Sequence, residues 1–186
     1  MTGIGSILAR IVAALDGANV PYMVAGSLAS THYSLPRSTF DVDIVIDPTL
    51  AALTSFVQAL SPDAYYVDLE SALEAFHLQR QFNVIDMATG WKVDFIIRKH
   101  RPFSVEEFRR RVATEMFGVS VHVATAEDTV IAKLEWAQLG GGSERQLRDV
   151  REIVDARGTD LDRGYVERWV DELGLRDEWS GINRDP

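Results

Sequence analysis

The sequence predicts an α+β fold, in which strands and helices are mixed up to about residue 124 and only helices follow. Two observations predict it. Up to that point, short apolar runs and two-residue alternation typical of strands lie between segments of helical spacing, whereas beyond it only helical spacing recurs. We therefore expect an α+β core over residues 1–124 and a C-terminal helical portion over residues 125–186 that packs on the core.

The elements of the first half follow from the period of the apolar residues and from the residues that bound each segment. Ser27 is expected to cap the second helix, and a proline to open the third. In chain order the expected elements are a helix over residues 1–17, a strand over 22–25, a helix over 27–33, a strand over 40–46, a helix over 48–60, a strand over 65–67 and a helix over 71–78.

The second half begins with a hairpin around Thr89 and Gly90 and continues into helices. Sequences that resemble capping boxes begin at Thr125 and Ser143, and each should start a helix. In chain order the expected elements are strands over 82–87 and 91–97, a helix over 105–112, a strand over 119–123, a helix over 125–139, a helix from 143 past 154, and one or two helices after 163.

The composition is ordinary for a soluble globular protein, with 46% hydrophobic and 25% charged residues. The absence of cysteine excludes disulfides and thiolate metal sites, and no apolar run is long enough to cross a bilayer. We therefore expect a cytoplasmic protein with no membrane partner. The net charge of -9 opposes anionic ligands unless metal ions or a local basic region compensate. Residues 92–111 form such a region, with seven basic and three acidic residues and a local charge of +4.

Three features could carry chemistry: the Gly26-Ser27 turn after a strand, the Asp41 and Asp43 pair on the next strand, and Asp94 on a later one. Because strand side chains alternate, Asp41 and Asp43 project from one face, roughly 7 Å apart, and two carboxylates so close favour a bridging cation. Such oxygen ligands suit Mg²⁺, and with Asp94 they form a candidate site for two metal ions. Gly26 permits close backbone approach, while Ser27 and the helix N-terminus offer donors to a triphosphate.

Each charged residue also has a plainer interpretation. Asp94 lies among apolar neighbours and needs a partner, which an ion pair with Lys92 or Arg98 would supply. Lys133 could simply lie on the solvated face of an amphipathic helix.

In this order and spacing, the three features resemble the active-site signature of the DNA polymerase β-like nucleotidyltransferase superfamily. Residues 24–27 and 36–43 are similar to its small bacterial branch, which includes the nucleotidyl transferases of abortive-infection and type IV toxin–antitoxin systems. Residues 126–128 with Lys133, and residues 148–150, are similar to the C-terminal helical motifs of that branch. The resemblance spans about residues 20–155 and implies a short mixed β-sheet flanked by helices.

The resemblance also implies that the chain is a nucleotidyltransferase that uses an NTP and two Mg²⁺ ions. Asp41 and Asp43 would bind both ions, and Asp94 would bind one and favour deprotonation of the acceptor hydroxyl. Arg37 and Thr39 precede the aspartate pair in the right place to touch phosphate, although a loop arginine and a strand-opening threonine explain them equally well. The predicted nucleotide-binding residues are therefore Gly26, Ser27, Arg37, Thr39 and Lys133.

The expected reaction moves a nucleoside monophosphate to an acceptor hydroxyl and releases pyrophosphate. An RNA or tRNA end as acceptor would make the chain a toxin-like enzyme with an antitoxin as a candidate partner. A small hydroxylated molecule such as an aminoglycoside would make it a resistance-type enzyme. The +4 region favours nucleic acid, whereas the acidity of the whole chain does not, and on balance an RNA or tRNA end is the favoured acceptor. A non-catalytic nucleotide-binding protein of the same fold is the alternative from another class, and the presence of all three carboxylates argues against it.

Overall fold

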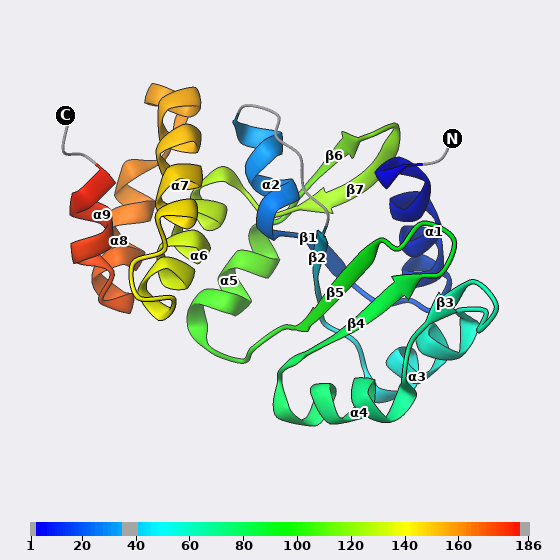
Figure 1. Cartoon of the computed structure of the whole chain (residues 1–186). Helices are drawn as coiled ribbons and strands as arrows, with labels where there is room; N and C mark the ends of the chain where they lie inside the picture. Colours follow the sequence, from blue (N-terminus) through cyan, green and yellow to red (C-terminus); the bar gives the residue numbers. More distant parts are fainter. Residues whose placement is uncertain (1–2, 35–40, 183–186) are drawn as a thin grey trace.

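A single seven-stranded mixed sheet organises the computed structural model, which describes residues 3–34 and 41–182 (Figure 1). Its strands pair antiparallel except at two junctions, β2 with β5 and β1 with β7, which are parallel. Across the sheet the strands are β3 (Tyr65–Tyr66), β4 (Gln81–Asp86), β5 (Lys92–Ile97), β2 (Asp41–Ile46), β1 (Tyr22–Val24), β7 (Val119–Val123) and β6 (Val112–Met116). The predicted α+β fold class is confirmed.

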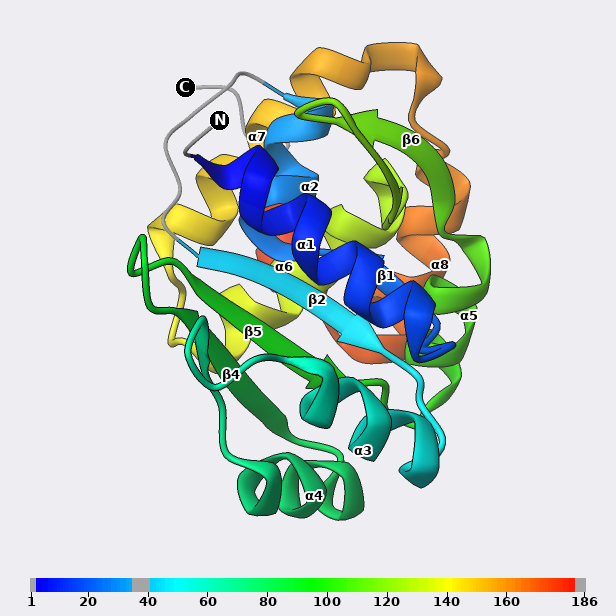
Figure 2. The same ribbon diagram turned by 90° about the vertical axis from the view of Figure 1, so that its right-hand side faces the viewer.

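Helices cover both faces of this sheet. Three of them, α1, α3 and α4, lie on one face, and α2 and the C-terminal helices lie on the other (Figures 1 and 2). In chain order the helices are α1 (Ile4–Gly17), α2 (Gly26–Tyr33), α3 (Leu50–Ala59), α4 (Leu69–Leu78), α5 (Pro102–Arg110), α6 (Ala126–Leu139), α7 (Glu144–Arg157), α8 (Arg163–Leu173) and α9 (Arg176–Ile182). None of the helices in the described part of the chain has the length and apolarity that a membrane span requires.

The alternation of buried apolar residues with more exposed residues along β2 decides which face of the sheet is apolar. Val42, Ile44 and Ile46 are fully buried in the main hydrophobic core, together with side chains of α1 and α3. Phe95, opposite Ile44 on β5, packs edge-on against Phe56 of α3, with ring centroids 5.1 Å apart. The intervening residues of β2 and β5 therefore project from the opposite face, where the polar residues of the sheet are gathered.

The helices α6 to α9 bury a second hydrophobic cluster of their own. Phe103 of α5 belongs to this cluster and lies 5.2 Å, centroid to centroid, from Trp169 of α8. A buried hydrogen-bond network reinforces the junction, because the fully buried Asp128 of α6 accepts hydrogen bonds from Arg110 of α5 and from the hydroxyl of Tyr165 of α8. These contacts fix α5 against the C-terminal helices.

One strand was not predicted. Residue 112 was expected to end a helix, but α5 ends at Arg110, and Val112–Met116 forms β6, the edge strand of a hairpin with β7. Most of β6 is exposed or half-buried, so its sequence lacks the apolar alternation that marked the other strands. The turn of this hairpin holds Gly118 at φ 77.

Three helix starts also differ from expectation. Pro48 does not open α3, because the helix begins at Leu50 with Thr49 in the N-cap position. Ser27 does not cap α2, because the helix begins one residue earlier at Gly26 with Ala25 in the N-cap position. Ser143 precedes α7 but makes no capping hydrogen bond through its side chain. The other expected cap is confirmed, since the Thr125 hydroxyl accepts a hydrogen bond from the backbone N–H of Asp128.

Candidate active site

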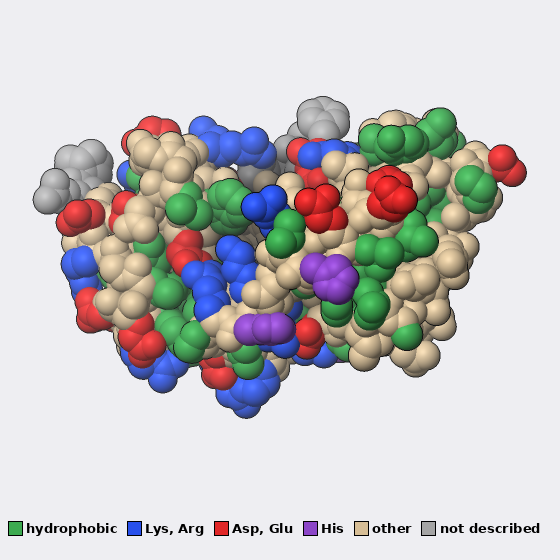
Figure 3. Space-filling model, turned by 90° about the horizontal axis from the view of Figure 1, so that it is seen from below, with side chains coloured by type: hydrophobic (Ala, Val, Ile, Leu, Met, Phe, Trp, Pro, Cys, Tyr) green, Lys and Arg blue, Asp and Glu red, His purple; other side chains and the backbone are tan. Residues whose placement is uncertain are grey.

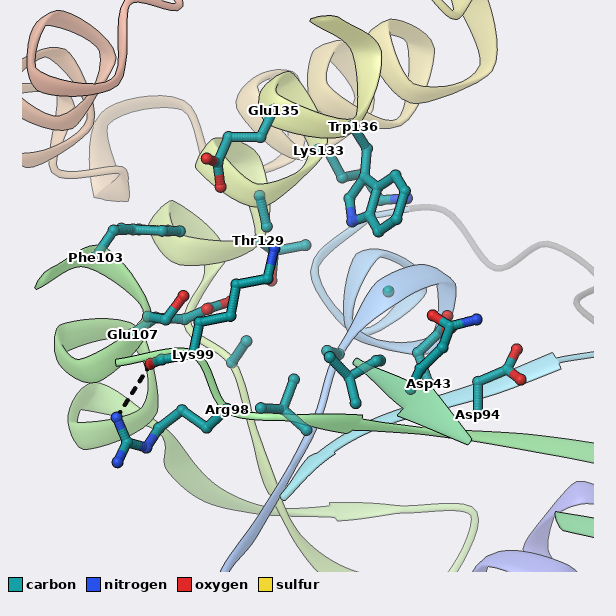
Figure 4. Close-up of a pocket in the computed structure, with 18 of the residues that line it drawn as sticks. Asp43, Asp94, Arg98, Lys99, Phe103, Glu107, Thr129, Lys133, Glu135 and Trp136 are labelled. Atoms are coloured by element: carbon teal, nitrogen blue, oxygen red, sulfur yellow. Dashed lines mark hydrogen bonds between the residues drawn. The ribbon is translucent and has the colours of Figure 1, made fainter. Parts of the chain in front are cut away.

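A cleft of about 420 Å³ opens between the polar face of the sheet and the helices α5 and α6. Side chains from many separate elements line it, among them the β1–α2 turn, β2, β5, α5, α6 and α7. Figure 4 shows Asp43 and Asp94 on the strands at one end of the cleft, and Glu107 on α5 toward the other. The predicted site residues that line it are Gly26, Ser27, Asp43, Asp94 and Lys133.

Asp43 and Asp94 are directly paired in the register of the parallel strands β2 and β5. The side chain of Asp43 is half-buried, and Asp94 is only 8% exposed. Burial raises the pKa of the Asp43 carboxyl, and the charge of Asp94 raises it further. The Asp94 Oδ1 atom is buried and has no hydrogen-bond partner among the described residues. Two carboxylates therefore lie close enough together for each to affect the charge of the other.

Lys92 is the counter-ion that the structure supplies. Its Nζ lies 2.8 Å from Asp94 Oδ2 and 3.7 Å from Asp41 Oδ1. The ion pair between Asp94 and Lys92 was the plainer interpretation of Asp94, and it is present. Arg98, the other candidate partner, instead pairs with Asp47 at 3.0 Å.

Asp41 stands apart from the other two aspartates. It lies on the same strand face as Asp43, but its side chain is largely exposed and faces Lys92. Within residues 3–34 and 41–182, no three Asp, Glu or His side chains converge in a metal-binding arrangement. The structure therefore brings Asp43 and Asp94 together, and leaves Asp41 at the rim beside the lysine.

The β1–α2 turn fits closely against Asp43. Gly26 has φ 58, and a Cβ added there would overlap the Asp43 carboxylate, so only glycine suits the position. The backbone N–H of Ser27, in the first turn of α2, donates a hydrogen bond to that carboxylate and opposes the rise of its pKa. The turn thus orients the aspartate, with the positive end of α2 directed at it.

Lys133 reaches the cleft from α6 and is 5% exposed, so it does not lie on a solvated helix face. Its Nζ is 2.7 Å from Asp149 Oδ2 and 2.9 Å from the side-chain oxygen of Gln146, both on α7. Its positive charge acts on Asp43 across the cleft and opposes the rise of the pKa of that carboxyl. The ammonium group is therefore held in place at the side of the cleft that faces the two aspartates.

Further cleft residues did not stand out in the sequence. Glu107 of α5 is buried, and burial, aided by the charges of Asp128 and Glu135, raises its pKa to about 8. Glu135 forms an ion pair with Arg101. Trp136 of α6 also lines the cleft, although it is largely exposed. The charge of Glu107 at a core-facing helix position was the one sequence signal that could have identified it.

Two predicted nucleotide-binding residues, Arg37 and Thr39, lie outside the described residues.

The carboxylates of the predicted site can be compared with the ligands that a divalent metal ion prefers. Asp43 and Asp94 offer carboxylate oxygens side by side, one of them buried and without a partner in residues 3–34 and 41–182, which suits a hard divalent cation. Asp41 could join them if its contact with Lys92 were exchanged for one with the ion. These residues therefore fit Mg²⁺.

No protein-family model and no curated protein sequence matches the chain. Solved structures do match. The solution structure of the antibiotic-resistance factor ANT(2'')-Ia has a TM-score of 0.60 at 16% identity, over 96% of this chain and 94% of that chain. The crystal structure of ANT(2'')-Ia in complex with adenylyl-2''-tobramycin has a TM-score of 0.59 at 16% identity, over 94% of this chain and 98% of that chain.

A third similar structure is an antigenic nucleotidyltransferase-like protein from Paracoccidioides brasiliensis. Its TM-score is 0.56 at 16% identity, over 96% of this chain and 90% of that chain. All three structures share with this chain an arrangement that extends over nearly its whole length. The chain therefore has the fold of these nucleotidyltransferase structures.

Proposed function

We propose that this protein is a metal-dependent nucleotidyltransferase, which moves a nucleoside monophosphate from an NTP to an acceptor hydroxyl. The observation that carries the proposal is the pairing of Asp43 with Asp94 beneath the Gly26-Ser27 turn, in a cleft that Lys133 faces. The fold shared with nucleotidyltransferase structures supports it. Asp41, Asp43 and Asp94 would hold Mg²⁺, which when bound neutralises the triphosphate and stabilises the charge of the leaving pyrophosphate.

The residues of the chain have separate tasks in this reaction. The acceptor oxygen attacks the α-phosphorus, the bond between that phosphorus and the α–β bridging oxygen breaks, and pyrophosphate leaves. Asp94 takes the proton of the acceptor hydroxyl, the role that the sequence resemblance implies for it. The N–H of Ser27 keeps Asp43 oriented, and Lys133 offers positive charge to the triphosphate.

The acceptor that the cleft suits best is a small hydroxylated molecule. The charge of +4 over residues 92–111 was the reason to favour RNA, but five of its seven cations form ion pairs with acidic residues. These five are Lys92, Arg98, Arg101, Arg109 and Arg110. In the view from below, Lys and Arg side chains accordingly lie beside Asp and Glu rather than in one continuous basic patch (Figure 3).

The cleft itself also favours a small acceptor. Its volume of about 420 Å³ lies in the range of small-molecule sites, and Glu107 and Glu135 offer carboxyl groups for hydrogen bonds away from the aspartate pair. One of the similar structures, ANT(2'')-Ia, was solved with adenylyl-2''-tobramycin. An RNA end, with an antitoxin as partner, stays the alternative that the sequence resemblance offers.

Label transfer tests the proposal. The protein is incubated with each α-labelled NTP and Mg²⁺, together with total cellular RNA in one series and a panel of amino sugars and aminoglycosides in another. We expect label on a small molecule and release of pyrophosphate. Asp43→Asn should abolish transfer, and Glu115→Gln, which alters an exposed carboxylate on β6, should leave it unchanged.

The remaining outcomes separate the alternatives. Label on one RNA species would make RNA the acceptor. Metal-dependent NTP binding without transfer to any acceptor would favour the non-catalytic protein. Transfer that persists in Asp43→Asn would contradict the assignment of the site.

A further inference from the structure

Trp136 is an unusual residue for the wall of a charged cleft. It is 59% exposed, and its indole makes no hydrogen bond or ring contact with the side chains or backbone of the described residues. Large aromatic side chains bury much apolar area when they are packed, so an indole left in solvent gives up stabilisation that a buried position would provide. A ligand that covers the ring would restore it.

The neighbours of Trp136 on α6 define what kind of ligand fits. Lys133 precedes it by three residues, so the two side chains lie about one helical turn apart on the same side of the helix. Figure 4 shows both directed from α6 toward Asp43 and Asp94. Leu139, three residues after Trp136, also lines the cleft and is 75% exposed. This side of α6 therefore presents a cation followed by an apolar, aromatic surface.

We propose that Trp136, with Leu139 beside it, is the platform on which the base of the nucleoside triphosphate stacks. The proposal rests on the proposed function, which places the triphosphate between Lys133 and the aspartates. A molecule with an anionic group and a flat ring matches the order of side chains along α6, and a nucleotide has both. The acceptor is expected at the other end of the cleft, where the described lining residues include the carboxyl groups of Glu107 and Glu135 and no exposed aromatic ring.

Stacking has a consequence for substrate choice. Every base has a π-face, so a stacking surface accepts all four bases with small differences in affinity. Among the described residues that line the cleft, no asparagine accompanies the indole, and the two glutamines, Gln81 and Gln146, come from β4 and α7. We therefore expect ATP, GTP, CTP and UTP to bind within about tenfold of one another, purines more tightly than pyrimidines because their rings are larger.

The test compares a nucleotide with a phosphate chain that has no base. Affinities are measured by calorimetry with Mg²⁺ for α,β-methylene-ATP, whose scissile bond is blocked, and for inorganic tripolyphosphate. Trp136→Ala should weaken binding of the nucleotide roughly 5- to 100-fold and leave that of tripolyphosphate unchanged. Trp136→Phe keeps a ring and should recover most of the loss. Tyr66→Ala removes a 61% exposed aromatic ring on β3, away from the cleft, and should change neither affinity.

Each result decides one of the two proposals. Unchanged nucleotide affinity in Trp136→Ala overturns the platform and leaves the proposed function standing, and an altered KM for the acceptor would then assign the ring to the acceptor. Equal weakening of both ligands also overturns the platform, because it would show damage to the phosphate site. If the wild-type protein binds neither ligand with Mg²⁺, the proposed function fails and the platform fails with it.

Discussion

Asp43 and Asp94 lie opposite each other on adjacent parallel strands, held from one side by the N–H of Ser27 and from the other by the ammonium group of Lys92. Each carboxylate therefore has a partner of its own, and neither partner removes the repulsion between the two. The raised pKa of Asp43 results mainly from burial and further from that repulsion. A bound cation would offset the repulsion between the two carboxylates and favour the ionised form of Asp43.

Asp43→Asn should abolish activity without loss of the fold. The substitution conserves shape, removes a metal ligand and ends the repulsion with Asp94, so we expect transfer to fall by about a hundredfold or more. The Tm of the metal-free protein should stay the same or rise. Both are measured on one preparation, by label transfer and by thermal unfolding. A collapsed Tm would instead indicate that the carboxylate only holds the strand in place.

Gly26→Ala should damage both stability and function. The position has φ 58, and the added Cβ would push the Asp43 carboxylate from its place, so unfolding should become easier by about 1–3 kcal/mol. Metal-dependent nucleotide binding should be lost with it. Gly17→Ala is the matched control, since a Cβ at this end of α1 meets no neighbouring atom. Denaturant unfolding and calorimetry of both variants test the prediction, and intact nucleotide binding in Gly26→Ala would contradict it.

Lys133→Ala should leave Asp149 buried without its ammonium partner. Removing one member of a buried ion pair typically costs about 3–5 kcal/mol, which denaturant unfolding would report. The double substitution Lys133→Met with Asp149→Leu replaces the pair by apolar groups and should recover most of the stability. It should not recover nucleotide binding, because the positive charge is gone. A double variant that binds NTP normally would show that Lys133 has only a structural role.

Glu107 should make stability fall as the pH rises. Its pKa in the folded protein is raised to about 8, above the value in the unfolded chain, so its neutral form is favoured by folding. The contribution is fully present below the unfolded pKa and is lost as the pH rises through about 8. Glu107→Gln should therefore have little effect on the free energy of unfolding at pH 4.5 and raise it by about 2–4 kcal/mol at pH 9.

Glu106→Gln is the control for this pH dependence. Glu106 is the preceding residue, and its hydrogen bonds from Arg109 lower its pKa. Its contribution to stability is present above the unfolded pKa and is lost toward acid pH, the reverse of Glu107. The two variants should thus diverge at alkaline pH, and parallel curves would rule out a buried, neutral Glu107.

Much of this arrangement could be predicted from local patterns. The alternation of β2 placed Asp41 and Asp43 on one face, and the apolar residues around Asp94 marked β5. Asp94 was expected to join Asp41 and Asp43 in one site, but its register opposite Asp43 could not be predicted, because register depends on which strands become neighbours. The same holds for Lys92, whose contact with Asp41 arises only because residues 41 and 92 share a register position.

The residues of the helical wall were harder to predict for another reason. Trp136 has the hydrophobic character of a core residue, and nothing local distinguishes it from the buried Trp169 and Trp179. Whether an aromatic side chain is covered depends on the packing of α6 against its neighbours. The edge strand β6 was missed because its exposed residues carry no apolar pattern, and only its pairing with β7 gives it strand conformation.

The parallel pairing of β2 with β5 has a consequence for the order of events in folding. The two strands are separated by α3, β3, α4 and β4, so the aspartate pair forms only after this long crossover has closed. Contacts between residues so far apart in the chain slow folding. A chain still emerging from the ribosome has no paired carboxylates until β5 has been synthesised. Divalent cations should therefore leave the refolding rate largely unaltered and act on the unfolding rate, because they bind a site that only the assembled sheet provides.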